Sequence, residues 1–329
     1  MPWMRPEDTG GMEMIYNLLG LLASSLALVV AGTLLVKSVN VIASFLRMSE
    51  FVVGFIIMAF GTSVPELFVG ISSAVAKNTA ITLGTVIGSN IANLTIVAGL
   101  GVLLAGGIRI ESEKTLKDST WMVGLAVLPM VLMIIGSQLG VIDGIILLAA
   151  FCAYGYKVIR ERSQFSKEVK HPIKRWQVIS HTLLFAASLF LLFFAADLVV
   201  NFASLLSVDL ALPPILIGLV LVALGTSLPE LAFNASAIRR GFSQMAVGDL
   251  IGSVIANSTL VLGVTCIIYP ISADMLLFFT SGIFMIIITF LFASFVESGQ
   301  KLYMKEGISM VMMYVFFLII EYYIKVFSG

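Results

Sequence analysis

The sequence predicts an all-α polytopic membrane protein whose ten transmembrane helices form two five-helix repeats of inverted topology. Three observations lead to this fold class: an apolar composition, ten apolar runs of spanning length, and a pair of motifs that occurs twice. Of the 329 residues, 59% are hydrophobic and only 12% are charged, whereas a soluble domain carries about a quarter charged residues. Because a protein folded in water needs a polar surface, a chain this apolar is expected to face lipid.

Apolar runs bounded by charged residues, glycines and prolines define the expected spans, since a helix needs ~20 apolar residues to cross a bilayer. In chain order they cover residues 15–46, 51–76, 80–106, 119–137, 140–159, 177–206, 213–238, 244–270, 273–296 and 308–327. The first and sixth runs are longer than a span requires, so we expect these two helices to be strongly tilted. The first run is also too long for the core of a signal peptide, so we expect it to be retained.

A polar connection divides the chain, and basic residues orient it. We expect a first five-helix repeat at 1–159, a basic linker at 160–176 and a second five-helix repeat at 177–329. Fifteen of the 19 lysines and arginines follow odd-numbered spans, at Arg47, Arg109, Lys114, Lys117, Lys157, Arg160, Arg162, Lys167, Lys170, Lys174, Arg175, Arg239, Arg240, Lys301 and Lys305. Basic loops remain in the cytoplasm. The sequence therefore predicts a multi-pass protein of the plasma membrane, with both termini extracellular and the linker cytoplasmic.

An internal repeat relates the two halves. Residues 59–99 align without a gap to residues 223–263, at an offset of 164 and with 18 identities in 41 positions. The shared residues are mainly small and polar, as in Gly-Thr-Ser-x-Pro-Glu and Gly-Ser-x-Ile-Ala-Asn. Five spans, an odd number, separate equivalent positions, so the two copies are expected to cross the membrane in opposite directions. Inverted repeats with interrupted helices at matching positions are typical of secondary transporters.

The first motif predicts an oxygen-rich patch at a helix break. Pro65 has no N–H group and crowds the preceding turn, so a backbone carbonyl near Gly61 loses its helical partner. In lipid such a carbonyl must find another partner or line a cavity. Oxygen-bearing side chains accompany the break at Thr62, Ser63 and Glu66 in the first copy and at Thr226, Ser227 and Glu230 in the second. Such ligands suit Ca2+, and a glutamate at the bilayer centre, which costs at least ~2.5 kcal/mol, is functional by default.

The second motif adds close packing and neutral ligands. Its residues are Gly84, Gly88, Ser89 and Asn93 in the first copy and Gly248, Gly252, Ser253 and Asn257 in the second. The two glycines of each copy lie four residues apart and are expected to let helices approach closely. The serine and the asparagine also lie four apart and so share a helix face. We expect each pair to point at the broken helix of its own repeat.

Asp249 breaks the symmetry of the repeat, because Thr85 stands at the equivalent position. It precedes Ser253 by one helical turn, so it lies on the helix face that bears the predicted site. Two interpretations remain open. Asp249 is either a relay for an ion or a proton, or a residue near the helix end in water.

At these two motifs the chain resembles the Ca2+/cation antiporter superfamily, and within it the Na+/Ca2+ exchangers, especially the short prokaryotic forms. The paired motifs look like the two alpha repeats of that family, and the resemblance extends over the whole chain in helix number, repeat position and the loop between the halves. It implies a secondary active antiporter that exchanges Ca2+ for Na+ by alternating access. The transported Ca2+ and Na+ would be its ligands, and no cofactor is expected.

The resemblance also implies a diamond of four cation sites, occupied alternately by Na+ and Ca2+. The matching side chains are Glu66, Glu230, Thr62, Thr226, Ser63, Ser227, Ser89, Ser253 and Asn93. The backbone carbonyls of Ala59 and Ala223 would add outer ligands. Some exchangers of the family carry an aspartate where this chain has Asn257, so this site would hold two carboxylates rather than three. That departure leaves the coupling ion and its number open.

Two other functions remain as alternatives. The first is an exchanger of H+ for Ca2+ or another divalent cation, because two protons balance two glutamates as two Na+ do. Clustered hydroxyl oxygens exceed what a proton carrier requires, which favours Na+. The second is a membrane-embedded hydrolase, but the spans carry no set of metal-binding His or Cys and no Ser/Lys nucleophile, so we expect no enzyme. Expected partners are Ca2+, Na+ or H+ and the lipid bilayer, with no nucleic acid and no obligatory protein partner.

Overall fold

The computed structural model describes residues 6–45, 63–109, 113–162, 175–239, 243–272, 275–299 and 301–328. The first half contains α1 (Pro6–Phe45), α3 (Val64–Val75), α4 (Thr79–Ala92), the π-helical η1 (Asn93–Val97), α5 (Ala98–Ala105), α6 (Glu113–Gly136) and α7 (Val141–Arg162). The second half contains α8 (Arg175–Asp209), α9 (Pro214–Ile217), the π-helical η3 (Gly218–Val222), α10 (Ala223–Thr226), α11 (Leu228–Arg239), α12 (Ser243–Ala256), the π-helical η4 (Asn257–Val261), α13 (Leu262–Ile268), α14 (Met275–Gly299) and α15 (Met304–Ser328). Two short strands, β1 (Ile108–Arg109) and β2 (Lys301–Leu302), pair antiparallel.

Among the described residues, eight helices are long and apolar enough to cross a membrane. Two shorter apolar helices, Val64–Val75 and Pro214–Thr226, lie within the second and seventh predicted spans. The part of the second predicted span before residue 63 lies outside the described residues. At the predicted linker, α7 continues to Arg162 and α8 already begins at Arg175, so helix extends into both ends of the 160–176 segment. The predicted all-helical membrane fold is therefore confirmed.

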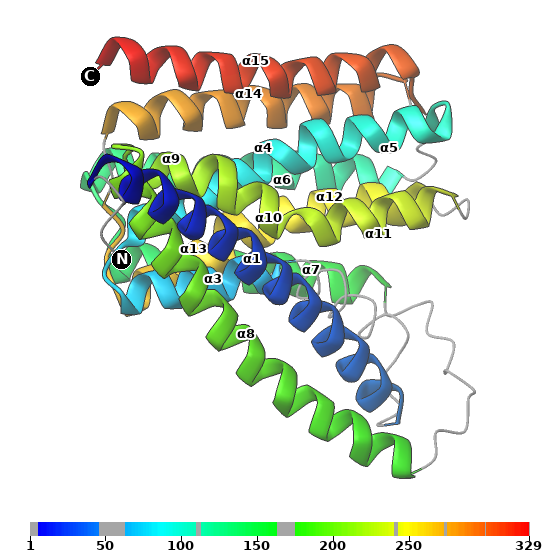
Figure 1. Ribbon diagram of the computed structural model, residues 1–329. Coiled ribbons are helices and arrows are strands. Elements are labelled where there is room, and N and C mark those ends of the chain that lie inside the picture. The colour runs from blue at the N-terminus through cyan, green and yellow to red at the C-terminus, as the bar shows by residue number, and fades with distance from the viewer. Residues whose placement is uncertain are drawn as a thin grey trace.

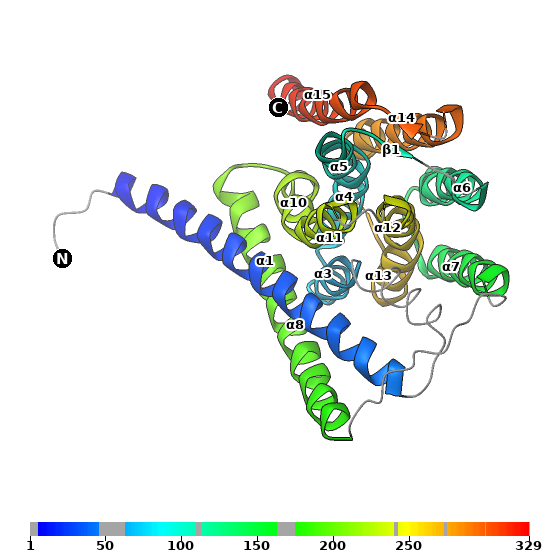
Figure 2. The same cartoon turned by 90° about the vertical axis from the view of Figure 1, so that its right-hand side faces the viewer.

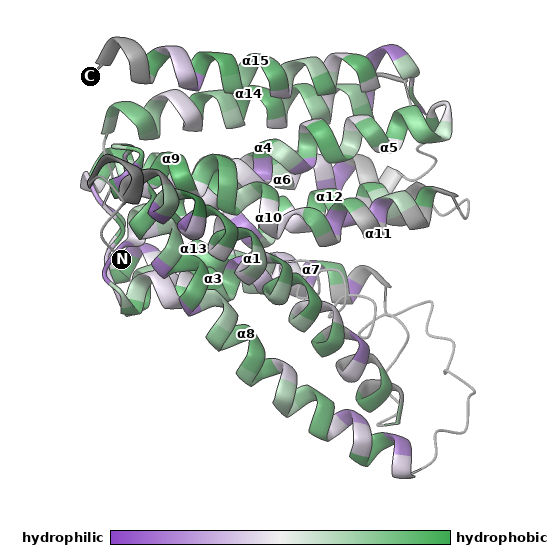
Figure 3. Ribbon diagram, viewed as in Figure 1, coloured by the Kyte–Doolittle hydropathy of each residue, from purple (hydrophilic) through white to green (hydrophobic). Residues whose placement is uncertain are grey.

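The molecule has the polarity expected in lipid. Large apolar side chains such as Ile142, Phe190 and Met312 are exposed on the outer helices, whereas Asn93 and Asn257 are fully buried. Figure 3 shows α14, α15 and much of α8 mostly hydrophobic, with some hydrophilic turns on α15, and hydrophilic segments among α4, α10 and α12. Because apolar side chains gain nothing by avoiding lipid, the outward-facing surface is apolar and the polar groups gather inside.

Two long helices lie across one side of a bundle. α1 and α8 pack against each other and run obliquely to the other helices (Figure 1). Seen from the side in Figure 2, α14 and α15 lie at the opposite edge, and α3, α4 and α10 to α13 lie between. The predicted strong tilt of the first and sixth spans agrees with this arrangement.

The contacts between helices stay the same when the two halves are exchanged. α3 packs on α4 as α11 packs on α12, and α3 packs on α13 as α11 packs on α5. Likewise α7 packs on α13 as α15 packs on α5, and α6 packs on α12 as α14 packs on α4. The core is thus shared, since each half completes the packing of the other.

Glycines bring α4 against α9 and η3, which precede the second copy of the first motif. A Cβ atom at Gly84 would stand 2.0 Å from the carbonyl oxygen of Ile215, and one at Gly88 would stand 2.0 Å from that of Leu219. These backbones touch, as predicted for the first copy. At Gly252, no atom of the described residues lies within 4 Å of a built Cβ. The segment equivalent to η3, residues 54–58, lies outside the described part of the chain.

Candidate cation site

Helices α3 and α11 begin at equivalent positions, and in the second copy, where the preceding residues are described, a break separates α10 from α11. Ser63 has φ −88° and ψ 4° just before α3, and Ser227 has φ −82° and ψ 2° between α10 and α11. Both departures from helical geometry lie two residues before a proline, which cannot donate a backbone hydrogen bond. In the second copy the break is confined to Ser227, whose N–H donates to the Ala223 carbonyl and whose carbonyl accepts from the Leu231 N–H.

Glu66 and Glu230 lie in the first turns of α3 and α11. Both side chains are fully buried, with 0% of their surface exposed. The positive end of each helix favours a carboxylate at this position and offsets part of the cost of burying it. The two carboxylates also interact electrostatically with each other, although they come from different halves. The structure therefore brings the two predicted glutamates into one buried region.

Hydroxyl groups from both halves connect this region. The Ser89 hydroxyl donates to Oε1 of Glu66 at 3.2 Å and lies 3.2 Å from the hydroxyl of Thr226. Thr226 in turn donates to the carbonyl oxygen of Ala223 at 3.2 Å. A residue of the first half thus contacts the second half's copy of the first motif directly, which places four predicted residues together: Glu66, Ser89, Ala223 and Thr226.

Several buried polar atoms at predicted positions have no hydrogen-bond partner among the described residues. They are Ser63 Oγ, Glu66 Oε2, both polar atoms of the Asn93 side chain, Ser227 Oγ, both carboxylate oxygens of Glu230, and Asn257 Oδ1. A buried oxygen without a partner costs about 1–3 kcal/mol, more if it is charged. Carboxylate, hydroxyl and amide oxygens are the ligands that Ca2+ takes and that suit other hard cations. The donor set therefore fits cation binding.

The two asparagines of the second motif begin π-helical segments. η1 starts at Asn93 and η4 starts at Asn257, which are equivalent positions. Single π-helical turns inside α-helices occur frequently at functional sites. The sequence predicts that Asn257 points at the broken helix of its own repeat, but its side-chain hydrogen bond crosses to the other half, where Nδ2 donates to Oδ1 of Asn90 at 3.2 Å. Asn90 itself donates to the Ser258 hydroxyl at 2.9 Å.

Asp249 is not near a helix end in water. Its side chain is fully buried, and Nδ2 of Asn234 donates to its Oδ2 at 2.9 Å. That interpretation is wrong because α12 begins at Ser243 and places residue 249 well inside the bundle. Of the other predicted ligands, Ser253 is fully buried in α12, whereas Thr62 and Ala59 lie outside the described residues.

Helix α1 covers both breaks. A Cβ at Gly225 would stand 3.0 Å from Cβ and Oγ of Ser25, and a Cβ at Gly32 would stand 3.3 Å from Cγ of Pro65. Ser25 and Gly32 are seven residues apart, so they lie on one face of α1. Small residues thus let α1 pack closely against the segments of both halves that lie next to Glu66 and Glu230.

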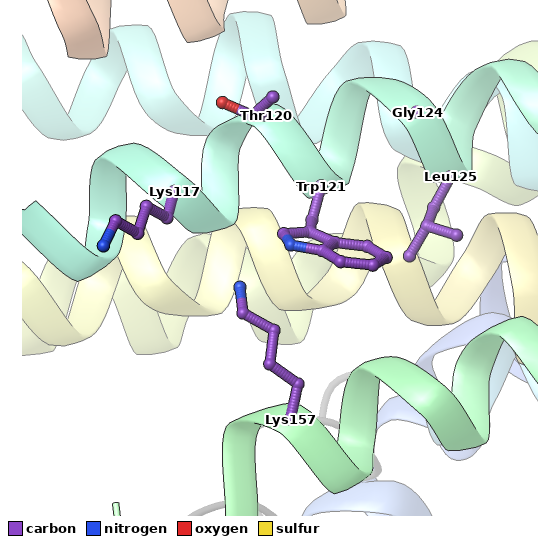
Figure 4. A pocket seen from close by; sticks show the side chains of 6 residues that line it. All are labelled: Lys117, Thr120, Trp121, Gly124, Leu125 and Lys157. Atoms are coloured by element: carbon purple, nitrogen blue, oxygen red, sulfur yellow. The ribbon is translucent and has the colours of Figure 1, made fainter. Parts of the chain in front are cut away.

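A separate pocket lies between α6 and α7 and is lined by Lys117, Thr120, Trp121, Gly124, Leu125 and Lys157 (Figure 4). The ammonium group of Lys157 lies 3.2 Å from Oδ1 of Asp118 and 5.2 Å from the centre of the Trp121 ring. Two lysines line this pocket and no carboxylate does, so its chemistry does not suit a cation. It plays no part in the candidate site.

Comparison with known proteins agrees with the fold and the motifs. The family described as Sodium/calcium exchanger protein matches residues 16–159 and 180–323. Sodium/calcium exchanger MaX1 of Methanosarcina acetivorans is 31% identical, over 94% of this chain and 99% of that protein. Inner membrane protein YrbG of Escherichia coli is 26% identical, over 83% of this chain and 86% of that protein.

Solved structures share the architecture. The sodium-calcium exchanger NCX_Mj superposes with a TM-score of 0.64 at 26% identity, over 92% of this chain and 98% of that one. The H+/Ca2+ exchanger CAX superposes with a TM-score of 0.78 at 16% identity, over 92% and 82% of the two chains, a likeness of fold. Since the family match covers both halves and both motifs, this chain belongs to the sodium/calcium exchanger family of the Ca2+/cation antiporter superfamily.

Proposed function

We propose that this protein exchanges Ca2+ for Na+ across the plasma membrane, by alternating access at a mid-membrane site built around Glu66 and Glu230. The observation that carries the proposal is the group of buried oxygens without partners at the two helix breaks. The names of MaX1 and NCX_Mj, which refer to sodium and calcium exchange, support the choice of ions. Glu66 and Glu230 are the primary ligands in this proposal.

Neutral oxygens complete the proposed ligand set. They are the side chains of Thr62, Ser63, Ser89, Asn93, Thr226, Ser227, Ser253 and Asn257 and the carbonyls of Ala59 and Ala223. The two ionised glutamates bring a charge of −2, which one Ca2+ or two Na+ neutralise. The same ligands therefore serve either ion, so the two ions compete for one region and are carried in alternation.

The proposed architecture is ten spans in two inverted repeats, at 1–159 and 177–329, joined by a cytoplasmic linker at 160–176. Equivalent backbone breaks at Ser63 and Ser227 support it, as does the exchange symmetry of the helix contacts. The distribution of lysine and arginine supports extracellular termini. In this scheme α1 and α8 move against the remaining helices and switch access.

A proton-coupled exchanger is the competing proposal, and ion gradients distinguish the two. Purified protein is reconstituted in liposomes and Ca2+ uptake is measured under an outward Na+ gradient, with pH and voltage clamped. We expect Na+-dependent uptake, since the clustered hydroxyl and amide oxygens can replace the hydration shell of Na+. Uptake that ignores Na+ and follows a pH gradient would make the protein an H+/Ca2+ exchanger.

A further inference from the structure

The two long helices α1 and α8 are joined to each other and meet the rest of the bundle largely through apolar side chains. Nδ2 of Asn17 on α1 donates to Oδ2 of Asp209 on α8 at 2.6 Å. Toward the bundle, Leu28 of α1 and Val199 of α8 are buried in one apolar cluster with Val69 of α3. Apolar contacts have no directional requirement, so they can form again after the two helices shift together along their neighbours.

Two buried serines of α1 and α8 bond within their own helices. The Ser38 hydroxyl of α1 donates to the carbonyl oxygen of Leu34 at 2.8 Å. The Ser188 hydroxyl of α8 donates to the carbonyl oxygen of Leu184 at 2.7 Å. Each of these bonds moves with the helix that makes it. A hydrogen bond to another helix would instead break during such a shift, because its strength depends on distance and angle.

A hydrogen bond of that second kind joins α8 to the turn between α3 and α4. Nδ2 of Asn78 donates to the hydroxyl of Ser204 on α8 at 2.9 Å, and both residues are half-buried. Asn78 is the N-cap residue of α4, where an asparagine side chain commonly accepts a hydrogen bond from the first turn of the helix. Its side chain makes no such cap here and reaches across to α8.

The α3–α4 turn that carries Asn78 is fixed to other parts of the bundle. The Ser73 hydroxyl donates to the carbonyl oxygen of Asn78 at 2.7 Å. The Thr79 hydroxyl donates to the carbonyl oxygen of Pro270, just beyond α13, at 3.1 Å. These bonds hold the turn in place, so movement of α8 past it has to break the bond between Asn78 and Ser204.

This bond lies on the side where α8 covers the bundle more closely. The α3–α4 turn follows the second span and is extracellular in the proposed topology, and α3 packs against α8 on the way to it. Exchange of the two halves turns this contact into that of α11 with α1, which is much smaller among the described residues. In Figures 1 and 2 the first turns of α8, at its cytoplasmic end, stand away from the bundle. In the proposed scheme this arrangement is closed toward the outside.

We propose that the hydrogen bond between Asn78 and Ser204 is a latch that favours the state closed to the extracellular side. This inference rests on the proposed transport of Ca2+ by alternating access. Phe242 stands at the position equivalent to Asn78, and its side chain cannot make such a bond, so the second half has no matching latch for the opposite state. A hydrogen bond of ordinary strength changes such an equilibrium by a factor of about 2 to 10.

Distances between two spin labels, measured by double electron–electron resonance in liposomes, test the latch directly. The labels are attached at Ala76→Cys, beside the α3–α4 turn, and at Val208→Cys on α8, in a protein with Cys152→Ser and Cys266→Ala. Both labelled positions are exposed. Saturating Ca2+ on both sides allows the loaded protein to switch. We expect two distances, of which the shorter belongs to the latched state.

Removal of either partner is expected to raise the ratio of the longer to the shorter distance about 2- to 10-fold. Asn78→Ala and Ser204→Ala each remove the bond, so the double variant should show no greater change. Ser188→Ala removes a hydroxyl that bonds within α8 and should leave the ratio unchanged. Either single variant suffices if the other does not fold.

Each result bears on the latch. An unchanged ratio in the single variants, or an equal rise in Ser188→Ala, would overturn the latch while Ca2+ uptake by the unaltered protein remains. Absence of Ca2+ uptake by the unaltered protein, under a Na+ gradient and under a pH gradient, would overturn the proposed transport and the latch together. A rise in Asn78→Ala and in Ser204→Ala, with no further rise in the double variant, supports the assignment.

Discussion

At the scale of single residues, Glu66 and Glu230 present an energetic problem that the protein solves only in part. A carboxylate at the centre of a bilayer costs at least ~2.5 kcal/mol. The first turn of a helix and the Ser89 hydroxyl stabilise the charge on Glu66. Several carboxylate oxygens still lack partners within the described residues. A bound cation would recover the remaining cost, which is why we propose these groups as the transport site.

Replacement of either glutamate by glutamine is expected to abolish Ca2+ transport. One carboxylate cannot neutralise a divalent ion, and removing one partner from a buried charged group costs about 3–5 kcal/mol. We expect Ca2+ uptake by Glu66→Gln and by Glu230→Gln to fall about 100-fold or more, since each factor of ten corresponds to about 1.4 kcal/mol. Uptake into proteoliposomes under a fixed Na+ gradient measures the effect.

Glu321 provides a matched control for this experiment. It is 4% exposed and accepts a hydrogen bond from the Ser281 hydroxyl at 2.6 Å, between α14 and α15. Glu321→Gln removes a buried membrane carboxylate outside the site and is expected to keep uptake. Near-normal uptake by either site variant would show that the altered glutamate is not a primary ligand.

The sequence alone predicted those site residues that occur in both copies of the repeat. Identity at a fixed offset is visible in one sequence, so Glu66, Ser89 and their equivalents stand out. Asn90 and Asn234 do not, because Val254 and Gly70 occupy the equivalent positions. Their roles depend on contacts that only the folded chain creates, such as the hydrogen bond between Asn90 and Asn257 across the two halves.

At the scale of helices, close glycine contacts predict a difference between equivalent positions. Gly88→Ala forces a Cβ to within 2.0 Å of the Leu219 carbonyl, so α4 and η3 must separate. We expect this overpacking to destabilise the protein by about 1–3 kcal/mol and to reduce flux. Gly252→Ala, where no described atom lies within 4 Å of the new Cβ, is the control. Thermal unfolding in detergent measures both, and equal stability of the two variants would contradict the packing argument.

A cross-link between α1 and α10 is expected to stop transport without stopping ion binding. A Cβ at Gly225 would stand 3.0 Å from that of Ser25, near the 3.5–4.5 Å separation of disulfides. Cysteines at these two positions, in a protein with Cys152→Ser and Cys266→Ala, should abolish flux on oxidation and recover it on reduction. Ca2+ should still raise the thermal stability of the cross-linked protein, because the ion site is unchanged. Undiminished exchange after complete cross-linking would rule out movement of α1 against the core.

Helix breaks could be predicted from the sequence, whereas π-helical segments could not. Pro65 and its equivalent predict a break by themselves, because a proline lacks the backbone N–H group in any helix. The π-helical starts at Asn93 and Asn257 have no such signal. A π-helical turn accommodates one extra residue against neighbouring helices, so its place is set by packing between the halves.

At the scale of the whole molecule, the positive-inside pattern predicts orientation. Ser166, in the basic linker, and Ser328, at the end of α15, should lie on opposite sides of the membrane. With each changed to cysteine in a protein with Cys152→Ser and Cys266→Ala, we expect a membrane-impermeant maleimide added outside intact cells to label Ser328→Cys alone. Labelling of both, or of Ser166→Cys alone, would contradict the proposed topology. The result tests the second repeat, because five spans, an odd number, place the linker and the C-terminus on opposite sides.

The unpartnered carboxylate oxygens also bear on leakage. Within the described residues no lysine or arginine pairs with Glu66 or Glu230, so in the proposed exchanger no described cation cancels the negative charge of the unloaded site. Moving that charge through the low-dielectric interior is costly. If the protein works as proposed, the unloaded form therefore stays open to the side where it released its last ion, until a new ion binds from that side. Such an exchanger would not let Na+ or Ca2+ leak down their gradients when no ion is available on the side that it faces.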